Sequence, residues 1–164
     1  MGSEMCIRDS DMGMSVRSVQ EKIDSLKEAN PMLGHRGCRL GISYPEITTM
    51  QAQAIIGAAE KLRNEGGNPV IEIMIPLVSS LEEFVNQKDI VDGEYKKIKS
   101  RSDLSINLKV GTMIEVPRAC LVAESIANKA DFFSFGTNDL TQTTYGFSRD
   151  DTGTFFPHYF DDEI

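Results

Sequence analysis

The chain has 164 residues, 40 % of them hydrophobic, so it is long enough to bury a core as one domain. Its formal net charge of −8 argues against a nucleic-acid groove or an anionic membrane surface as the main partner. The apolar runs are about strand length, far short of the roughly 20 residues that span a bilayer. Three cysteines without CxxC spacing predict neither a disulfide framework nor a zinc site, and a reducing, cytoplasmic setting is expected.

The first ten residues differ from the rest of the chain. They show no hydrophobic periodicity, and residues 5–10 (Met-Cys-Ile-Arg-Asp-Ser) resemble a translated sequencing adapter. We interpret residues 1–10 as a non-native leader and exclude them from the prediction of the fold. Residues 11–164 then form the domain to be explained.

Two amphipathic helices are predicted in the first half of this domain. The first begins after Ser15, where apolar residues recur at steps of three and four. The second begins at Pro45, a residue suited to a first helical turn, and ends at Gly66. Its predicted buried stripe consists of Ile47, Met50, Ala54, Ala58 and Leu62.

Strands and helices alternate after that point. An almost continuous apolar run over 70–77 predicts a strand covered on both faces, and Ser80 with Glu83 predicts a capping box for the next helix. Two further strands are predicted, over 108–116 and over 131–136, with a helix starting at Pro117 between them. The alternation predicts an α/β fold with a parallel sheet, either open and doubly wound or part of a (β/α)8 barrel. Because a full barrel needs about 250 residues, an incomplete barrel fits three strands best.

Two of these strands end in a carboxylate. Glu115 and Asp139 are separated by one strand–helix–strand unit, so both are expected at the carboxyl edge of the sheet, where neighbouring strands lie roughly 5 Å apart. Two carboxylates at that spacing repel, and a hard divalent cation between them would relieve the repulsion. The alternative makes Asp139 a helix cap and Glu115 a solvated strand end. The pattern alone does not choose between them.

Two further segments are suited to an anion. Arg36 and Arg39 flank Gly37-Cys38, and a guanidinium group matches phosphate or carboxylate with two hydrogen bonds. Gly136-Thr137-Asn138 opens a helix, where free backbone amides bind anions. The alternatives are an exposed arginine in a turn and a plain turn. Signatures of nucleotide-binding loops such as GxxxxGK[ST] do not occur.

Taken together, these segments resemble a known enzyme family. Residues 30–40 (Asn-Pro-Met-Leu-Gly-His-Arg-Gly-Cys-Arg-Leu), 73–77, 111–119, 132–142 and 146–151 are similar to pyruvate, phosphate dikinase, in its C-terminal phosphoenolpyruvate/pyruvate-binding (β/α)8 barrel. The resemblance covers nearly all of residues 11–164. Phosphoenolpyruvate synthase and enzyme I of the phosphotransferase system share the Ile-Glu and Gly-Thr-Asn-Asp-Leu-Thr-Gln elements. His-Arg-Gly-Cys-Arg-Leu and Gly-Phe-Ser-Arg-Asp-Asp favour the dikinase over both.

The resemblance implies a function and a set of site residues. It implies Mg²⁺-dependent phosphoryl transfer that interconverts ATP, phosphate and pyruvate with AMP, diphosphate and phosphoenolpyruvate. Glu115 and Asp139 would be the Mg²⁺ ligands. The implied substrate-binding residues are Arg36, Glu115, Gly136, Thr137, Asn138 and Asp139. The phosphohistidine of the family and its proton-donating cysteine match no residue of this sequence, so no catalytic residue is assigned.

The resemblance also implies partners and an alternative. The substrates would be pyruvate and phosphoenolpyruvate, and the partners would be the phosphohistidine and nucleotide-binding domains of a full-length, homodimeric enzyme. We expect a fragment, since the chain starts with the leader and stops within a loop, and we expect it to be inactive alone because these domains are missing from it. The alternative from another class is a non-catalytic module that binds phosphoenolpyruvate or pyruvate.

Overall fold

The structure is a computed structural model that describes residues 15–27, 32–101 and 106–164. The chain divides into two compact units, residues 1–35 and 36–164. The residues interpreted as a leader, 1–10, lie outside the described ranges, as do Asn30 and Pro31. Within these ranges, no helix combines the length and the apolar character needed to cross a membrane.

The described part of the first unit is built on helix α2 (Val16–Ser25). Its start is the one that the sequence predicts, because Ser15 is the N-cap residue and its hydroxyl accepts a hydrogen bond from the Ser18 N–H at 3.2 Å. Arg17 and Glu21 form an ion pair one turn apart on its surface. The predicted helix is confirmed.

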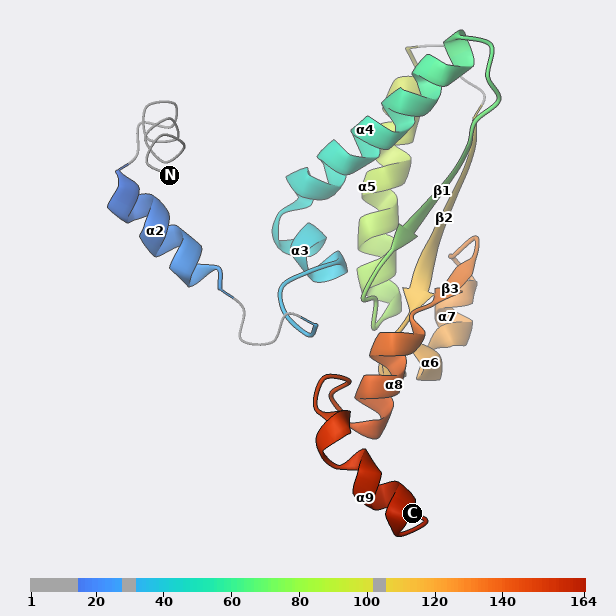
Figure 1. Cartoon of the computed structure of the whole chain (residues 1–164). Helices are drawn as coiled ribbons and strands as arrows, with labels where there is room; N and C mark the ends of the chain where they lie inside the picture. The colour runs from blue at the N-terminus through green and yellow to red at the C-terminus, as the bar shows by residue number, and fades with distance from the viewer. Residues whose placement is uncertain (1–14, 28–31, 102–105) are drawn as a thin grey trace. The chain divides into compact units, whose positions relative to one another are not determined.

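The second unit alternates strands with helices (Figure 1). Its elements in chain order are α3 (Cys38–Ser43), α4 (Pro45–Asn64), β1 (Val70–Ile75), α5 (Leu81–Lys99), β2 (Asn107–Ile114), α6 (Pro117–Leu121), α7 (Ala123–Ala127), β3 (Phe133–Phe135), α8 (Thr137–Tyr145), the 3₁₀ helix η1 (Thr152–Thr154) and α9 (Phe156–Asp161). The predicted α/β class with a parallel sheet is confirmed.

The three strands form one parallel sheet in the order β1-β2-β3. The register pairs Ile75 with Thr112, and Ile114 with Phe135. The last residue of β2 therefore lies level with the last residue of β3. Side chains that follow these two residues are brought together at the carboxyl edge of the sheet.

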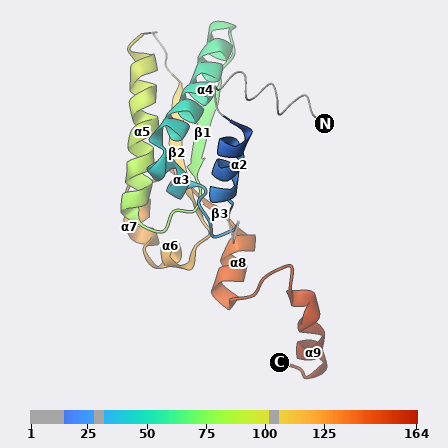
Figure 2. The same cartoon turned by 90° about the vertical axis from the view of Figure 1, so that its left-hand side faces the viewer.

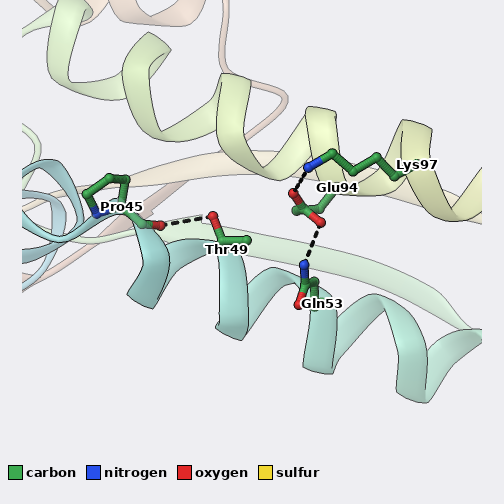
Figure 3. Close-up of polar contacts among 5 residues, drawn as sticks. All are labelled: Pro45, Thr49, Gln53, Glu94 and Lys97. Carbon is green, nitrogen blue, oxygen red and sulfur yellow. Dashed lines mark hydrogen bonds and ion pairs between the residues drawn. The ribbon is translucent and has the colours of Figure 1, made fainter.

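Helices α4 and α5 run alongside β1 and β2 and pack against each other (Figure 2). Figure 3 shows a polar contact that joins them: the Gln53 amide of α4 donates to Glu94 of α5 at 2.8 Å, and Lys97 pairs with the other carboxylate oxygen. Glu94 is buried, and a buried carboxylate is tolerated only when it is paired and hydrogen-bonded. A second polar contact, in which the Thr48 hydroxyl of α4 donates to Oε1 of the buried Gln87 of α5 at 2.7 Å, joins the same two helices.

Helix α5 begins with the predicted capping box. The Ser80 hydroxyl accepts from the Glu83 N–H, and the Glu83 carboxylate accepts from the Ser79 and Ser80 N–H groups at 2.6 and 3.1 Å. The helix runs through the charged stretch that follows and ends at Lys99. Its three lysines in the last turn lie where positive charge stabilises the negative end of the helix dipole.

The core lies between this pair of helices and the sheet. Phe84 of α5 is fully buried there among aliphatic residues. The other fully buried aliphatic members of the core cluster are Ile56, Val78, Val91, Val110, Ala119 and Ile126. Thr112 of β2 is also fully buried, and its hydroxyl donates to the Ile75 carbonyl oxygen at 2.8 Å, which ties β2 to β1.

Three local predictions are wrong. In α4 the buried residues are Ala52, Ile56 and Ala59, whereas Met50 is 60 % exposed, because small side chains allow α4 to approach α5 and the sheet closely. Strand β1 alternates between buried and exposed positions instead of being covered on both faces. The single helix predicted from Pro117 is two short ones, α6 and α7, separated at Val122.

The packing of α5 makes a first prediction. Phe84→Ala should lower the free energy of unfolding by about 3–5 kcal/mol, because it removes a fully buried ring and leaves a cavity. Met50→Ala is the matched control, since it also truncates a large apolar side chain but at an exposed position, and should change stability by less than about 0.5 kcal/mol. Urea unfolding followed by circular dichroism measures both. Equal losses of stability in the two variants would contradict the burial of Phe84 and the exposure of Met50.

Candidate functional site

The candidate site lies where β2 and β3 end. Glu115 directly follows Ile114 of β2, and Gly136 directly follows Phe135 of β3, its partner in the sheet. The Gly136 N–H continues the ladder by donating to the Ile114 carbonyl oxygen at 3.1 Å. The chain then enters α8, whose first turn carries Asp139. The parallel pairing thus brings the two predicted carboxylates together.

Glu115 is not a solvated strand end. Its side chain is only 5 % exposed, and its Oε1 accepts a hydrogen bond from the Leu77 N–H at 2.7 Å. Its carboxyl group also lies within hydrogen-bonding reach of Asp139. Burial of this kind costs several kcal/mol for an ionised group unless partners compensate.

The electrostatics of Glu115 follow from these contacts. Burial raises the pKa of its carboxyl group above the ordinary value, and the neighbouring Asp139 carboxylate raises that pKa further. The Leu77 N–H and the Arg36 charge act in the opposite direction, but they do not outweigh burial. A positive charge placed between the two carboxylates would therefore favour the ionised form of Glu115 and lower its pKa.

Asp139 does not act as the N-cap of α8. The N-cap residue is Gly136, which makes no side-chain capping bond, and Asp139 is the third residue of the helix. Its carboxylate lies against the carboxyl group of Glu115, whose pKa it raises.

Gly136 allows the two chain segments to approach each other. A Cβ atom at this position would lie 2.5 Å from both Cβ and Oε2 of Glu115, and 2.8 Å from Sδ of Met113. Its φ of −83° is open to any residue, so the requirement for glycine is steric. The same contact shows that Oε2, the oxygen that Leu77 does not bind, faces the start of α8.

Arg36 reaches the same edge through the glycine that follows it. Gly37 has a φ of +58°, and a Cβ there would lie 2.9 Å from the Pro76 carbonyl oxygen. The Cys38 N–H donates to that oxygen at 3.0 Å, which fixes the segment to the end of β1. Arg36 itself is exposed, and its charge acts on Glu115. The structure thus brings Arg36, Glu115 and Asp139 into electrostatic contact.

Thr137 and Asn138 are exposed at the start of α8 and line a cavity of about 730 Å³. Arg149 lines the same cavity, with aromatic residues that include Phe147 and Phe156. The Arg149 N–H donates to Oε1 of Gln142 at 2.8 Å, which fixes its loop to α8. Arg149 was not among the site residues predicted from the sequence. Its place in the Gly-Phe-Ser-Arg-Asp-Asp segment, shortly after the carboxylate-bearing turn, is the feature that could have indicated it.

The donor set is suited to one class of metal. Within residues 15–27, 32–101 and 106–164, no group of three or more His, Cys, Asp or Glu side chains is arranged to hold a metal ion. A cation at the Glu115–Asp139 pair would have carboxylate ligands only, and would take its other ligands from water or a bound molecule. Mg²⁺ binds in this way, whereas structural zinc requires four ligands from the protein. The residues present fit Mg²⁺.

Comparison with known proteins identifies the family. The family model described as "PEP-utilising enzyme, PEP-binding domain" matches residues 1–163. The chain belongs to this family. The chloroplastic pyruvate, phosphate dikinase of Flaveria trinervia is 52 % identical over 149 residues, which are 91 % of this chain and 16 % of that protein.

Two other relatives extend the comparison. The pyruvate, phosphate dikinase of Clostridium symbiosum is 49 % identical over 93 % of this chain and 18 % of its own length. Pyruvate, phosphate dikinase 2 of Zea mays is 51 % identical over 95 % of this chain and 17 % of its own length. This chain of the PEP-utilising family therefore spans less than a fifth of the length of each.

The close approach at Gly136 makes a second prediction. Gly136→Ala should lower the free energy of unfolding by about 1–3 kcal/mol, because the added methyl group displaces Glu115 or the turn. Gly93→Ala in α5 is the control, since its methyl group would meet no atom within 4 Å and should stabilise the helix by about 0.5–1 kcal/mol. Chemical unfolding of both variants gives the comparison. A neutral Gly136→Ala would contradict the contact.

The buried carboxyl group of Glu115 leads to a third prediction. Because the pKa of Glu115 is raised on folding, its contribution to the stability of the metal-free chain should be fully present below the ordinary pKa of a glutamate and be lost as the pH rises through the raised value. Glu115→Gln keeps an oxygen that accepts from Leu77 but cannot ionise. Its stability relative to the wild-type chain should therefore be greater at pH 7 than at pH 4.

Urea unfolding at both pH values in a chelating buffer measures this difference. Glu124→Gln is the matched control, because it makes the same chemical change at an exposed position of α7. If the stability advantage of Glu115→Gln were the same at pH 4 and pH 7, Glu115 would not titrate anomalously.

Proposed function

We propose that residues 11–164 are part of the phosphoenolpyruvate/pyruvate-binding (β/α)8 barrel of a pyruvate, phosphate dikinase. The observation that supports this most directly is the pairing of buried Glu115 with partly exposed Asp139 at the carboxyl ends of two neighbouring parallel strands, with the Arg36 charge acting on Glu115. Active sites of (β/α)8 barrels lie at that end of the sheet. The relatives of about 50 % identity are named as dikinases, which favours this enzyme over phosphoenolpyruvate synthase and enzyme I.

Glu115 and Asp139 would hold Mg²⁺. The raised pKa of Glu115 supports this role, because a pair of adjacent carboxylates ionises readily only when a cation lies between them. When bound, Mg²⁺ would neutralise the pair and polarise the oxygens of a bound substrate. The task of the protein is to hold Oε2 of Glu115 and the Asp139 carboxylate on the same side of the strand ends.

The substrate would be bound by the groups around this pair. Arg36 would contact the phosphoryl group or carboxylate with its planar guanidinium group. Thr137 and Asn138 are exposed at the positive end of α8, where backbone N–H groups are available to an anion. Gly136 would contribute by letting the start of α8 lie directly against Glu115. Arg149, which lines the cavity with Thr137 and Asn138, would add a second positive charge.

The reaction would be phosphoryl transfer between a phosphohistidine and pyruvate. Catalysis of this type depends on positioning and charge neutralisation, which arginines and the carboxylate-bound cation supply. The phosphohistidine and nucleotide-binding domains would belong to the full-length, homodimeric enzyme. The 164 residues alone are therefore expected not to turn over. A cytoplasmic location stays a prediction from the sequence.

Metal binding by the chain tests the proposal. Electron paramagnetic resonance of Mn²⁺, a substitute for Mg²⁺, should show one bound ion whose signal changes when oxalate, a mimic of the pyruvate enolate, is added. Glu115→Ala and Asp139→Ala should each weaken Mn²⁺ binding at least about tenfold, or about 1.4 kcal/mol, because each removes a charged ligand. Arg36→Gln should leave Mn²⁺ binding intact and weaken oxalate binding.

Glu124→Ala is the matched control, because it removes one negative charge from an exposed position on α7. Circular dichroism melting confirms that each variant is folded. Mn²⁺ affinity that is unchanged in folded Glu115→Ala and Asp139→Ala would reject the proposed metal site.

A further inference from the structure

The turn after β1 has an unusual backbone conformation. Leu77 has a φ of +60°, in the left-handed region that a residue with a branched side chain rarely adopts. Such a conformation is strained and persists only when the surroundings enforce it. Leu77 is 3 % exposed and packs in the core, so its surroundings are fixed.

This conformation directs the Leu77 N–H at the candidate site. The group donates to Oε1 of Glu115 at 2.7 Å rather than to a backbone carbonyl of the sheet. A hydrogen bond to a charged acceptor is about twice as strong as a neutral one and orients the acceptor. With Oε1 held in this way, Oε2 is left facing Gly136 and the start of α8.

The other side of the turn is fixed by Cys38. Its Sγ donates to the Leu77 carbonyl oxygen at 3.2 Å, and its N–H donates to the Pro76 carbonyl oxygen at 3.0 Å. Cys38 is buried, and burial raises the pKa of its thiol to about 12, so the thiol keeps its proton and remains a donor at neutral pH. The residue two positions before it is Arg36.

We propose that Leu77 and Cys38 are positioning residues. The Leu77 N–H, directed by the strained backbone of this residue, sets the orientation of Glu115. The Cys38 thiol holds the turn after β1 at a fixed distance from Arg36. This inference rests on the proposed metal-binding role of Glu115. It assigns Cys38 a role as hydrogen-bond donor and not as a nucleophile. It also gives the strain at Leu77 a function, because relaxing the backbone there would turn the N–H away from Oε1.

The decisive experiment replaces one amide with an ester. Leucic acid at position 77, introduced by nonsense suppression, removes the N–H while retaining the side chain, and should weaken Mn²⁺ binding by the 164-residue chain about tenfold. The chain offers a matched control: the Val110 N–H also donates to a carboxylate oxygen at 2.7 Å, that of Asp131, toward the other end of β2. The hydroxy-acid analogue at position 110 should lower stability similarly but leave Mn²⁺ affinity unchanged.

A second pair of variants tests the thiol. Cys38→Ala removes the donor to Leu77 and should weaken Mn²⁺ binding several-fold, whereas Cys38→Ser keeps a hydroxyl donor and should retain affinity within about twofold of the wild-type value. A role in stability alone would lower the melting temperature of Cys38→Ala without changing the Mn²⁺ affinity of the folded chain. The rescue by serine distinguishes positioning from loss of volume, because serine and alanine both leave part of the sulfur site empty.

The outcomes separate this inference from the function on which it rests. If the wild-type chain binds no Mn²⁺, the proposed metal site is rejected and the positioning role is rejected with it. If the wild-type chain binds Mn²⁺ and Glu115→Ala abolishes binding, but the ester at position 77 and Cys38→Ala leave it unchanged, the metal site stands and the positioning role is overturned. Equal weakening by the esters at 77 and 110 would also overturn it.

Discussion

A buried carboxylate at the end of β2 is the constraint on which the site depends. Glu115 is almost completely shielded from water and lies beside a second carboxylate, so its ionised form is disfavoured by both burial and repulsion. The hydrogen bond from Leu77 and the charge of Arg36 offset only part of this. The fold maintains the arrangement because parallel pairing of β2 with β3 places the two chain segments level with each other. A cation bound between the two carboxylates would offset their repulsion most directly.

Much of the fold follows from local pattern in the sequence. The strands, the Ser80–Glu83 capping box and the start at Pro45 are encoded by short-range rules, and each is present. The proximity of Glu115 and Asp139 was also predictable, because one strand–helix–strand unit places successive strand ends side by side in a parallel sheet. The face of α4 was not predictable. The apolar pattern predicts that Met50 and Leu62 are buried, but both are exposed. The residues that pack in the core include the smaller Ala52 and Ala59.

The features that sequence alone did not reveal are long-range and depend on the backbone. Nothing in the local sequence indicates that Leu77 has a left-handed φ, because the conformation is enforced by contacts with Cys38 and Glu115, each 38 or 39 positions away. The reason for glycine at 136 likewise lies in Glu115, 21 positions earlier, and not in its own φ. The residue pattern left the roles of Arg36 and Asp139 open, the family resemblance implied them, and the structure adds the electrostatic contacts of both residues with Glu115.

The hydrogen-bonded thiol of Cys38 has a consequence for the dynamics of the protein. Alkylating reagents attack the thiolate, and a buried thiol with a pKa of about 12 supplies almost none at neutral pH. Cys38 can therefore be modified only when the turn after β1 separates from the start of α3, whereas Cys120 on the surface is accessible throughout. The rate at which Cys38 is labelled thus measures how often this edge of the sheet opens. The protein contains its own probe of local unfolding.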